Sequence, residues 1–263
     1  MQPELSGPSA ALALFKLTPP YTRFEEMPGL DASEMPDLPL GSVLVIELSD
    51  HAAWPAVAQA APRLRARFPA APLALRVRNG VGIDPAEAAR LAAPYHIRAV
   101  LGEDAPPRET LQPVLTDPAS LTQELEDWLA ARGVDPPAPL RSLIVDIFRQ
   151  APDHPRLHGL LQALGRPERT VRNWFQRAGL PGPGAWLAAA HAVYAALRLQ
   201  RERQTSLLTI AVECGYSDHS SLSRQAVRLF GARPGEIRQT LGWEGLLDRW
   251  LGRAGVGVGA ASA

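Results

Sequence analysis

Cysteine, lysine and long apolar runs are scarce in this chain of 263 residues. The single cysteine, Cys214, excludes an internal disulfide and a zinc site made of several cysteines. The single lysine, Lys16, leaves one candidate for any chemistry that needs an amine side chain. The most apolar long stretch, residues 185–199, is shorter than a membrane span, and the beginning of the sequence does not resemble a signal peptide. We therefore expect a cytoplasmic protein without membrane contact.

The sequence also lacks a net charge, because 27 basic residues balance 27 acidic ones. The balance is uneven along the chain. Residues 1–135 hold 11 basic and 18 acidic residues, a net charge of −7, whereas residues 136–263 hold 16 and 9, a net charge of +7. An acidic half joined to a basic half predicts two domains with different partners. The basic half is the candidate for binding nucleic acid.

The first half alternates between strand and helix patterns. Apolar runs predict strands at residues 11–17, 43–48, 73–77 and 97–101, and the intervening residues 18–41, rich in Pro, Gly and acidic residues, are predicted to be irregular. Helices are predicted at 51–68, 85–95, 108–115 and 118–132, with Asp84 and Asp117 as N-caps. This alternation predicts an α/β regulatory or dimerisation domain over residues 1–132, with a small parallel sheet.

The second half is predicted to be all-α. A proline-rich linker at residues 133–139 marks the predicted boundary, and strand patterns vanish beyond it. Helices are predicted within the domain 140–241 at residues 140–150, 156–164, 167–178, 184–203, 206–214, 218–230 and 234–241. Residues 242–263 are predicted to form an amphipathic helix, with an apolar stripe from Trp243 to Leu251, and a flexible tail from residue 254.

Two pairs of these helices share a design. In the later pair, Ser206 is a candidate N-cap of the first helix, Gly215 is placed to end it, and either Ser217 or Asp218 can cap the second helix. Ser220 and Arg224 point away from the apolar stripe of the second helix. A short helix, a glycine turn and a helix with a polar outer face together indicate a helix-turn-helix.

The earlier pair, residues 156–164 and 167–178, repeats this pattern. Arg169, Asn173 and Gln176 point outward from its second helix, with Arg172 on the flank. Arginine, asparagine and glutamine are side chains that read base edges in the major groove. The helix at 184–203 is about 30 Å long and would set the two units roughly one DNA turn apart.

The sharpest motif is residues 210–238, IAVECGYSDHSSLSRQAVRLFGARPGEIR. Its Ile-Ala, Gly-aromatic-Ser, Phe-Gly, Pro and Arg positions, and the helix spacing across 140–240, resemble the DNA-binding domain of AraC/XylS-type bacterial transcription regulators. The resemblance implies two helix-turn-helix units that bind double-stranded DNA. The base or groove contacts that it implies come from Arg169, Arg172, Asn173, His219, Ser220, Ser221 and Arg224, and Gln176 is added because of its outward position.

The sequence departs from the family pattern in the second unit. Leu222 and Ala226 stand where the family usually has phenylalanine, and Val227 stands where a basic residue is common. These departures leave open a helix-turn-helix module that contacts protein and does not bind DNA.

The N-terminal half resembles the receiver domain of response regulators in one respect, because Asp50 follows the apolar strand at 43–48. The resemblance implies a flavodoxin-like fold. Receivers also have an acidic pair after the first strand and a lysine after the last, and neither is present, so we interpret the half as a pseudo-receiver. Asp50 is interpreted as a turn or helix-capping residue.

Together these patterns predict a sequence-specific DNA-binding transcription regulator of AraC type that is not an enzyme and has no catalytic residue, cofactor or metal. Candidate partners are double-stranded DNA, RNA polymerase, a second copy of the chain, and a small-molecule or protein effector of the N-terminal domain. The alternative is an α/β enzyme or small-molecule-binding protein with an accessory helical domain. For that alternative, the candidate residues at the strand ends are Asp50, Arg78 and Glu103.

Overall fold

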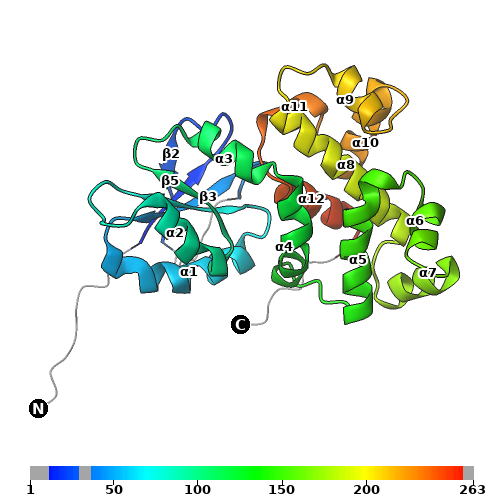
Figure 1. The fold of residues 1–263 in the computed structure, drawn as a ribbon, viewed down its shortest axis with the longest axis horizontal. Coiled ribbons are helices and arrows are strands. Elements are labelled where there is room, and N and C mark those ends of the chain that lie inside the picture. Colours follow the sequence, from blue (N-terminus) through cyan, green and yellow to red (C-terminus); the bar gives the residue numbers. More distant parts are fainter. Residues whose placement is uncertain (1–11, 30–36, 257–263) are drawn as a thin grey trace, which may run out of the picture.

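The computed structural model describes residues 12–29 and 37–256. An α/β part built from the N-terminal half lies beside a helical part (Figure 1). None of the helices in the described ranges is both long and apolar enough to cross a membrane. Most of the flexible tail predicted from residue 254, namely residues 257–263, lies outside the described residues, as does Ala11 at the start of the first predicted strand.

The sheet of the α/β part is mixed. Within the described residues it has five strands in the order β2-β1-β3-β4-β5, namely β1 (Ala13–Leu17), β2 (Phe24–Glu26), β3 (Val43–Leu48), β4 (Leu73–Val77) and β5 (Ile97–Gly102). Strands β3, β4 and β5 run parallel, whereas β1 is antiparallel to both β2 and β3. The predicted α/β class is confirmed, and the expectation of a small parallel sheet is corrected to a mixed one, because β1 runs antiparallel to its neighbours.

The reversed direction of β1 has a physical reason. A parallel pair needs a long crossover, which is usually a helix, and the chain forms no helix between β1 and β3 in the residues that the structure describes. Strand β2 lies in the segment predicted to be irregular. It is only three residues long and its two glutamates are exposed, so it has no apolar alternation that a sequence pattern could reveal.

Helices cover both faces of the sheet. On β3, Leu44, Ile46 and Leu48 pack into one core with α1 (Trp54–Arg67) and α2 (Pro85–Ala92). Val43 and Val45 face the other way, into a second core with α3 (Pro107–Leu115). The nearly uninterrupted apolar run of β3 therefore reflects burial on both faces.

The predicted N-caps of the α/β part are confirmed. The Asp84 carboxylate accepts hydrogen bonds from the backbone amides of Ala86 and Glu87 at the start of α2, at 2.8 and 2.9 Å. The Asp117 carboxylate accepts one from the amide of Ala119 at the start of α4 (Pro118–Ala131), at 2.9 Å. Caps of this kind satisfy amides that have no partner inside the helix.

The helical part surrounds one long central helix. Its elements are α5 (Ala138–Gln150), α6 (Leu157–Ala163), α7 (Glu168–Arg177), α8 (Pro183–Arg201), α9 (Leu207–Glu213), α10 (His219–Phe230), α11 (Pro234–Gln239) and α12 (Glu244–Arg253). Trp186 of α8 is fully buried, with its ring centre 4.7 Å from that of Trp250 and 6.3 Å from those of Phe148 and Phe175. Replacing such a residue with alanine typically costs about 3–5 kcal/mol.

The hydrophobic cores do not divide at the predicted linker, residues 133–139. Helix α4 precedes that linker, yet its apolar stripe belongs to the helical core, through Leu121, Leu125, Trp128 and Leu129. The rings of Trp128 and Trp243 meet edge to face, with their centres 5.7 Å apart. The division of the chain into domains at 1–132, 133–139, 140–241 and 242–263 stays a prediction, and the packing favours a helical unit that includes α4.

Candidate nucleic-acid interface

The first helix-turn-helix unit consists of α6 and α7. Gly165, in the turn, has φ of +63°, a conformation that favours glycine. Val171 and Phe175 of α7 are fully buried, and their burial fixes which side of the helix faces solvent. The side chains predicted to contact DNA are all exposed on α7: Arg169, Arg172, Asn173 and Gln176. The structure therefore brings them together on one outward face.

Arg172 has an internal partner on this face. Its guanidinium donates two hydrogen bonds to Glu168 Oε1, from Nε at 2.9 Å and from Nη2 at 2.6 Å. Both side chains are exposed, so this pair contributes at most about 0.3–0.5 kcal/mol to stability. It orients Arg172, and it also offsets part of the attraction that Arg172 would have for a phosphate.

The second unit consists of α9 and α10, and its predicted caps are confirmed. Ser206 Oγ accepts a hydrogen bond from the amide of Thr209 at 3.0 Å, and Gly215 has φ of +82° in the turn. Asp218 Oδ1 accepts a hydrogen bond from the amide of Ser221 at 2.7 Å. That bond is the main reason why the pKa of Asp218 is lowered below its usual range, so the cap is ionised at neutral pH.

The residues of the second unit that are predicted to contact DNA lie in the first two turns of α10. His219 and Arg224 are exposed, and Ser220 and Ser221 are half-buried. Arg224 Nη2 donates to Ser221 Oγ at 3.1 Å, and that hydroxyl also lies 2.8 Å from Ser217 Oγ. Ser221 is therefore engaged in the local hydrogen bonds of the cap, and Arg224 shares one of them. His219 and Arg224 are the two exposed side chains among these four. Whether any of these residues touches DNA stays a prediction.

Apolar side chains share the outer surface of the second unit. Leu208 and Val212 of α9 are 52% and 55% exposed, and Val227 of α10 is 45% exposed. Cys214, at the end of α9, packs against the helical core, and burial raises the pKa of its thiol. This agrees with a packing role for the cysteine. The outer surface of this unit is thus less uniformly polar than that of the first.

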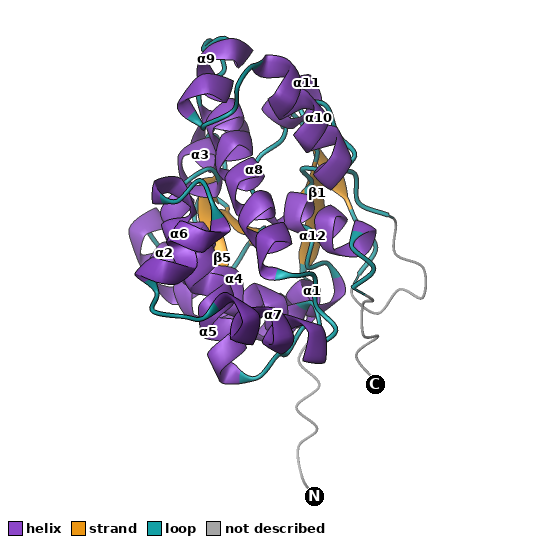
Figure 2. Ribbon diagram, turned by 90° about the vertical axis from the view of Figure 1, so that its right-hand side faces the viewer, coloured by secondary structure: helices purple, strands orange, loops and turns teal. Residues whose placement is uncertain are grey.

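Helix α8 joins the two units. Helix α8 is in contact with α6 and α7 of the first unit and with α9 and α10 of the second. Figure 2 shows α7 at one end of the helical part and α9 and α10 at the other, with α8 between them. At 19 residues and about 1.5 Å per residue, α8 is about 28 Å long.

Charged side chains near the carboxyl ends of β3, β4 and β5 form ion pairs with one another. Glu47 pairs with Arg76 at 3.0 Å, and Glu103 pairs with Arg78 at 3.4 Å. Glu103 also accepts a hydrogen bond from the amide of Asn79, which is the main reason why its pKa is lowered. These contacts bring Arg78 and Glu103, two candidates of the enzyme alternative, into an ion pair.

The third candidate of that alternative, Asp50, has a local role. Its carboxylate accepts a hydrogen bond from the amide of Ala52 at 3.0 Å, as N-cap of the short turn His51–Ala53 before α1. The Nε2 atom of His191 lies 2.8 Å from the carbonyl oxygen of Ala151, so this histidine also has a local partner. The described ranges contain no group of three or more side chains suited to hold a metal ion.

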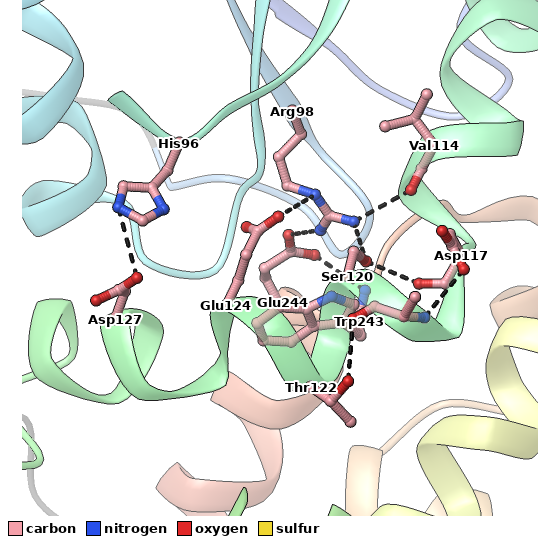
Figure 3. A network of polar contacts seen from close by, with 11 residues as sticks. His96, Arg98, Val114, Asp117, Ser120, Thr122, Glu124, Asp127, Trp243 and Glu244 are labelled. Atoms are coloured by element: carbon pink, nitrogen blue, oxygen red, sulfur yellow. Dashed lines mark hydrogen bonds and ion pairs between the residues drawn. The ribbon is translucent and has the colours of Figure 1, made fainter. Parts of the chain in front are cut away.

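Sequence reasoning missed a buried cluster between the two parts (Figure 3). Arg98 of β5, with 2% of its side chain exposed, pairs with Glu244 at the start of α12 and with Glu124 of α4, the latter at 3.3 Å. It also donates to Ser120 Oγ and, at 3.2 Å, to the carbonyl oxygen of Val114. Burial raises the pKa of Glu124 to about 7. The available signal was a lone arginine inside an apolar strand, but its partners are distant in sequence.

Comparison with known proteins bears on the helical part. Residues 160–240, which run from within α6 to just beyond α11, match a helix-turn-helix domain family of AraC-type regulators. No curated protein and no solved structure is detectably similar to the chain. The match falls on the two units whose caps, turns and outward faces are described above, and it agrees with the resemblance carried by residues 210–238. The helical part of this chain therefore contains an AraC/XylS-type helix-turn-helix domain, and the family of that domain consists of DNA-binding regulators.

Proposed function

We propose that this protein is a sequence-specific transcription regulator that reads two adjacent major-groove segments of double-stranded DNA, one with α7 and one with α10. The observation that carries the proposal is the presence of an exposed polar face on the second helix of each unit, at opposite ends of one helix. The length of α8, about 28 Å, is of the order of the roughly 34 Å between successive major-groove faces on one side of DNA.

The side chains divide into two roles under this proposal. Arg169 and Arg224 are the candidates for bidentate contact with guanine, and Asn173 and Gln176 for contact with adenine. His219 and Ser220 lie at the first turn of α10, where they would contact a base edge or the backbone. The remaining two would position the helices on the phosphates. Arg172 already pairs with Glu168, and Ser221 lies in the local hydrogen bonds of the cap, where it also accepts from Arg224.

The experiment begins with duplexes selected from a random-sequence library by the full chain. Arg169→Ala and Arg224→Ala should each weaken binding to the selected duplex by about 1–3 kcal/mol, with a smaller loss on a scrambled duplex. Arg90→Ala is the matched control, because Arg90 is an exposed arginine on α2, far along the chain from both units. Equal losses on selected and scrambled duplexes would contradict base reading by these arginines.

A second candidate function rests on the exposed apolar side chains of the second unit. Leu208 and Val212 lie one helical turn apart on α9, and Val227 lies on α10. An apolar surface of this kind suits contact with another protein better than contact with phosphates. If α10 serves this function, Arg224→Ala leaves DNA affinity unchanged while Arg169→Ala lowers it.

A further inference from the structure

The N-terminal domain reaches the end of α8 through α3. Gln112 of α3 donates hydrogen bonds from Nε2 to the carbonyl oxygens of Gln200 and Arg201, at 3.3 and 3.1 Å. Helix α8 ends at Arg201, and the last carbonyls of a helix have no amide partner inside it. One side chain of the α/β part therefore satisfies two free carbonyls at the C-terminal end of the helix that joins the two units.

Helix α3 also reaches the end of α11. Arg108 of α3 donates from Nη1 to the carbonyl oxygen of Gln239 at 3.0 Å and from Nη2 to that of Arg238 at 3.4 Å. Gln239 is the last residue of α11, and a cation at a helix C-terminus is favourable. The guanidinium of Arg108 also lies over the ring of Tyr21, with 5.4 Å between the guanidinium carbon and the ring centre.

Helix α11 in turn holds the turn that leads from α8 into the second unit. Arg238 donates from Nη1 to the carbonyl oxygen of Arg203 at 2.6 Å and from Nη2 to that of Thr205 at 2.8 Å. The buried Gln200 donates from Nε2 to Thr240 Oγ1 and to the carbonyl oxygen of Gly242, both at 3.0 Å. The C-terminal ends of α8 and α11 are thus tied to each other as well as to α3.

The turn that Arg238 contacts, residues 202–206, leads directly into α9. The turn ends at Ser206, the N-cap of α9, and Arg198 of α8 pairs with both Glu202 in the turn and Glu213 at the end of α9. Helix α10 packs on α9 across the glycine turn. A shift of α3 would therefore move the turn, α9 and α10 together.

Helix α3 is itself fixed to the sheet. Leu111 and Leu115 of α3 are fully buried, in the same core as Ala99 and Leu101 of β5. Binding at the sheet that displaced β5 or α3 would be transmitted to the end of α8 through the four hydrogen bonds of Arg108 and Gln112.

We propose that α3 sets the position of the second recognition helix relative to the first, with Gln112 and Arg108 as the positioning residues. Because the hydrogen bonds of α3 to α8 lie at the C-terminal end of that helix, α3 would control reading of the second DNA segment and leave reading of the first unchanged. This inference rests on the proposed function, since it assumes that both units read DNA.

The test is Gln112→Glu in the full chain, because an ionised glutamate keeps the side-chain size but has no hydrogen to donate to the two carbonyls. On a duplex selected by the unmodified chain, footprinting should show the segment of the second unit losing protection and the first keeping it. Affinity should fall about tenfold, the size expected when one base-reading arginine no longer reaches its base. Glu109→Ala, on an exposed neighbour in α3, is the matched control and should change neither.

Protection of both segments in Gln112→Glu, or equal loss from both, would overturn the proposal. If this variant does not fold, Gln112→Ala decides in the same way, because it removes the donor without adding a charge. Hydrogen exchange without DNA separates the failure of this inference from that of the proposed function. Faster exchange confined to residues 202–216 in the variant is expected whether or not the chain binds DNA, and unchanged exchange there would refute the positioning role.

Discussion

The buried contact of Arg98 is predicted to stabilise the folded chain by several kcal/mol (about 3–5). Arg98→Met removes the cation that faces Glu244 and Glu124 and leaves Glu244, with 6% of its side chain exposed, in a buried place without its partner. Breaking a buried pair by removing one partner typically costs about 3–5 kcal/mol. We expect a loss of this size in the free energy of unfolding, measured by denaturant titration followed through tryptophan fluorescence.

Arg78→Met is the matched control. Arg78 also pairs with a glutamate across the sheet, at 3.4 Å, but 51% of its side chain is exposed. An exposed pair contributes at most about 1 kcal/mol, so this variant should stay within that range. The double variant Arg98→Met/Glu244→Met should recover part of the loss, because it removes the buried Glu244 carboxylate and leaves only Glu124, with 25% of its side chain exposed, without the arginine. A cost for Arg98→Met no larger than that for Arg78→Met would refute the argument.

The remaining predictions concern pH, the helical unit and the N-terminal half. Burial raises the pKa of Glu124 from 4.5 to about 7, so the native state binds more protons than the unfolded state between these values, and the free energy of unfolding should fall as the pH rises through this window. Denaturant titrations at several pH values should show this contribution as the difference between the unmodified chain and Glu124→Gln, and a difference that rises with pH would contradict it. A fragment of residues 140–263 should melt at a lower temperature in calorimetry than one of 118–263, since only the longer one keeps Trp128 against Trp243; equal melting would count against the grouping of α4 with the helical core. Acetyl phosphate with Mg²⁺ should leave the intact mass unchanged, because Asp50 caps a helical turn and no lysine follows the last strand; a phosphoryl gain that disappears in Asp50→Asn would show the reverse.

The elements that could be predicted are those with a strong local signal. The apolar run of residues 43–48 predicted the strand that the structure shows as β3. The N-caps are Asp84, Asp117, Ser206 and Asp218, as their side-chain chemistry predicts. The outward faces of α7 and α10 also followed from local periodicity, because apolar residues such as Val171 and Leu222 recur at helical spacing and are buried together.

The elements that could not be predicted depend on contacts between distant residues. The direction of β1 depends on its pairing with β3, although the lack of a helical sequence pattern between the two strands was a usable signal against a parallel pair. Arg98 and Glu244 are 146 residues apart, and the periodicity of either segment says nothing about the other. The same holds for Gln112 and the end of α8, where the acceptors are backbone carbonyls that carry no sequence signature.

Hydroxyl-radical footprinting of the full chain on a selected duplex tests the central claim most directly. The unmodified chain should protect two segments on one face of the DNA, with centres about 10 base pairs apart, one helical turn. Arg169→Ala should weaken protection of one segment and Arg224→Ala of the other. A footprint confined to one segment, or one that both variants weaken at the same positions, would contradict the claim that α7 and α10 read adjacent major-groove segments.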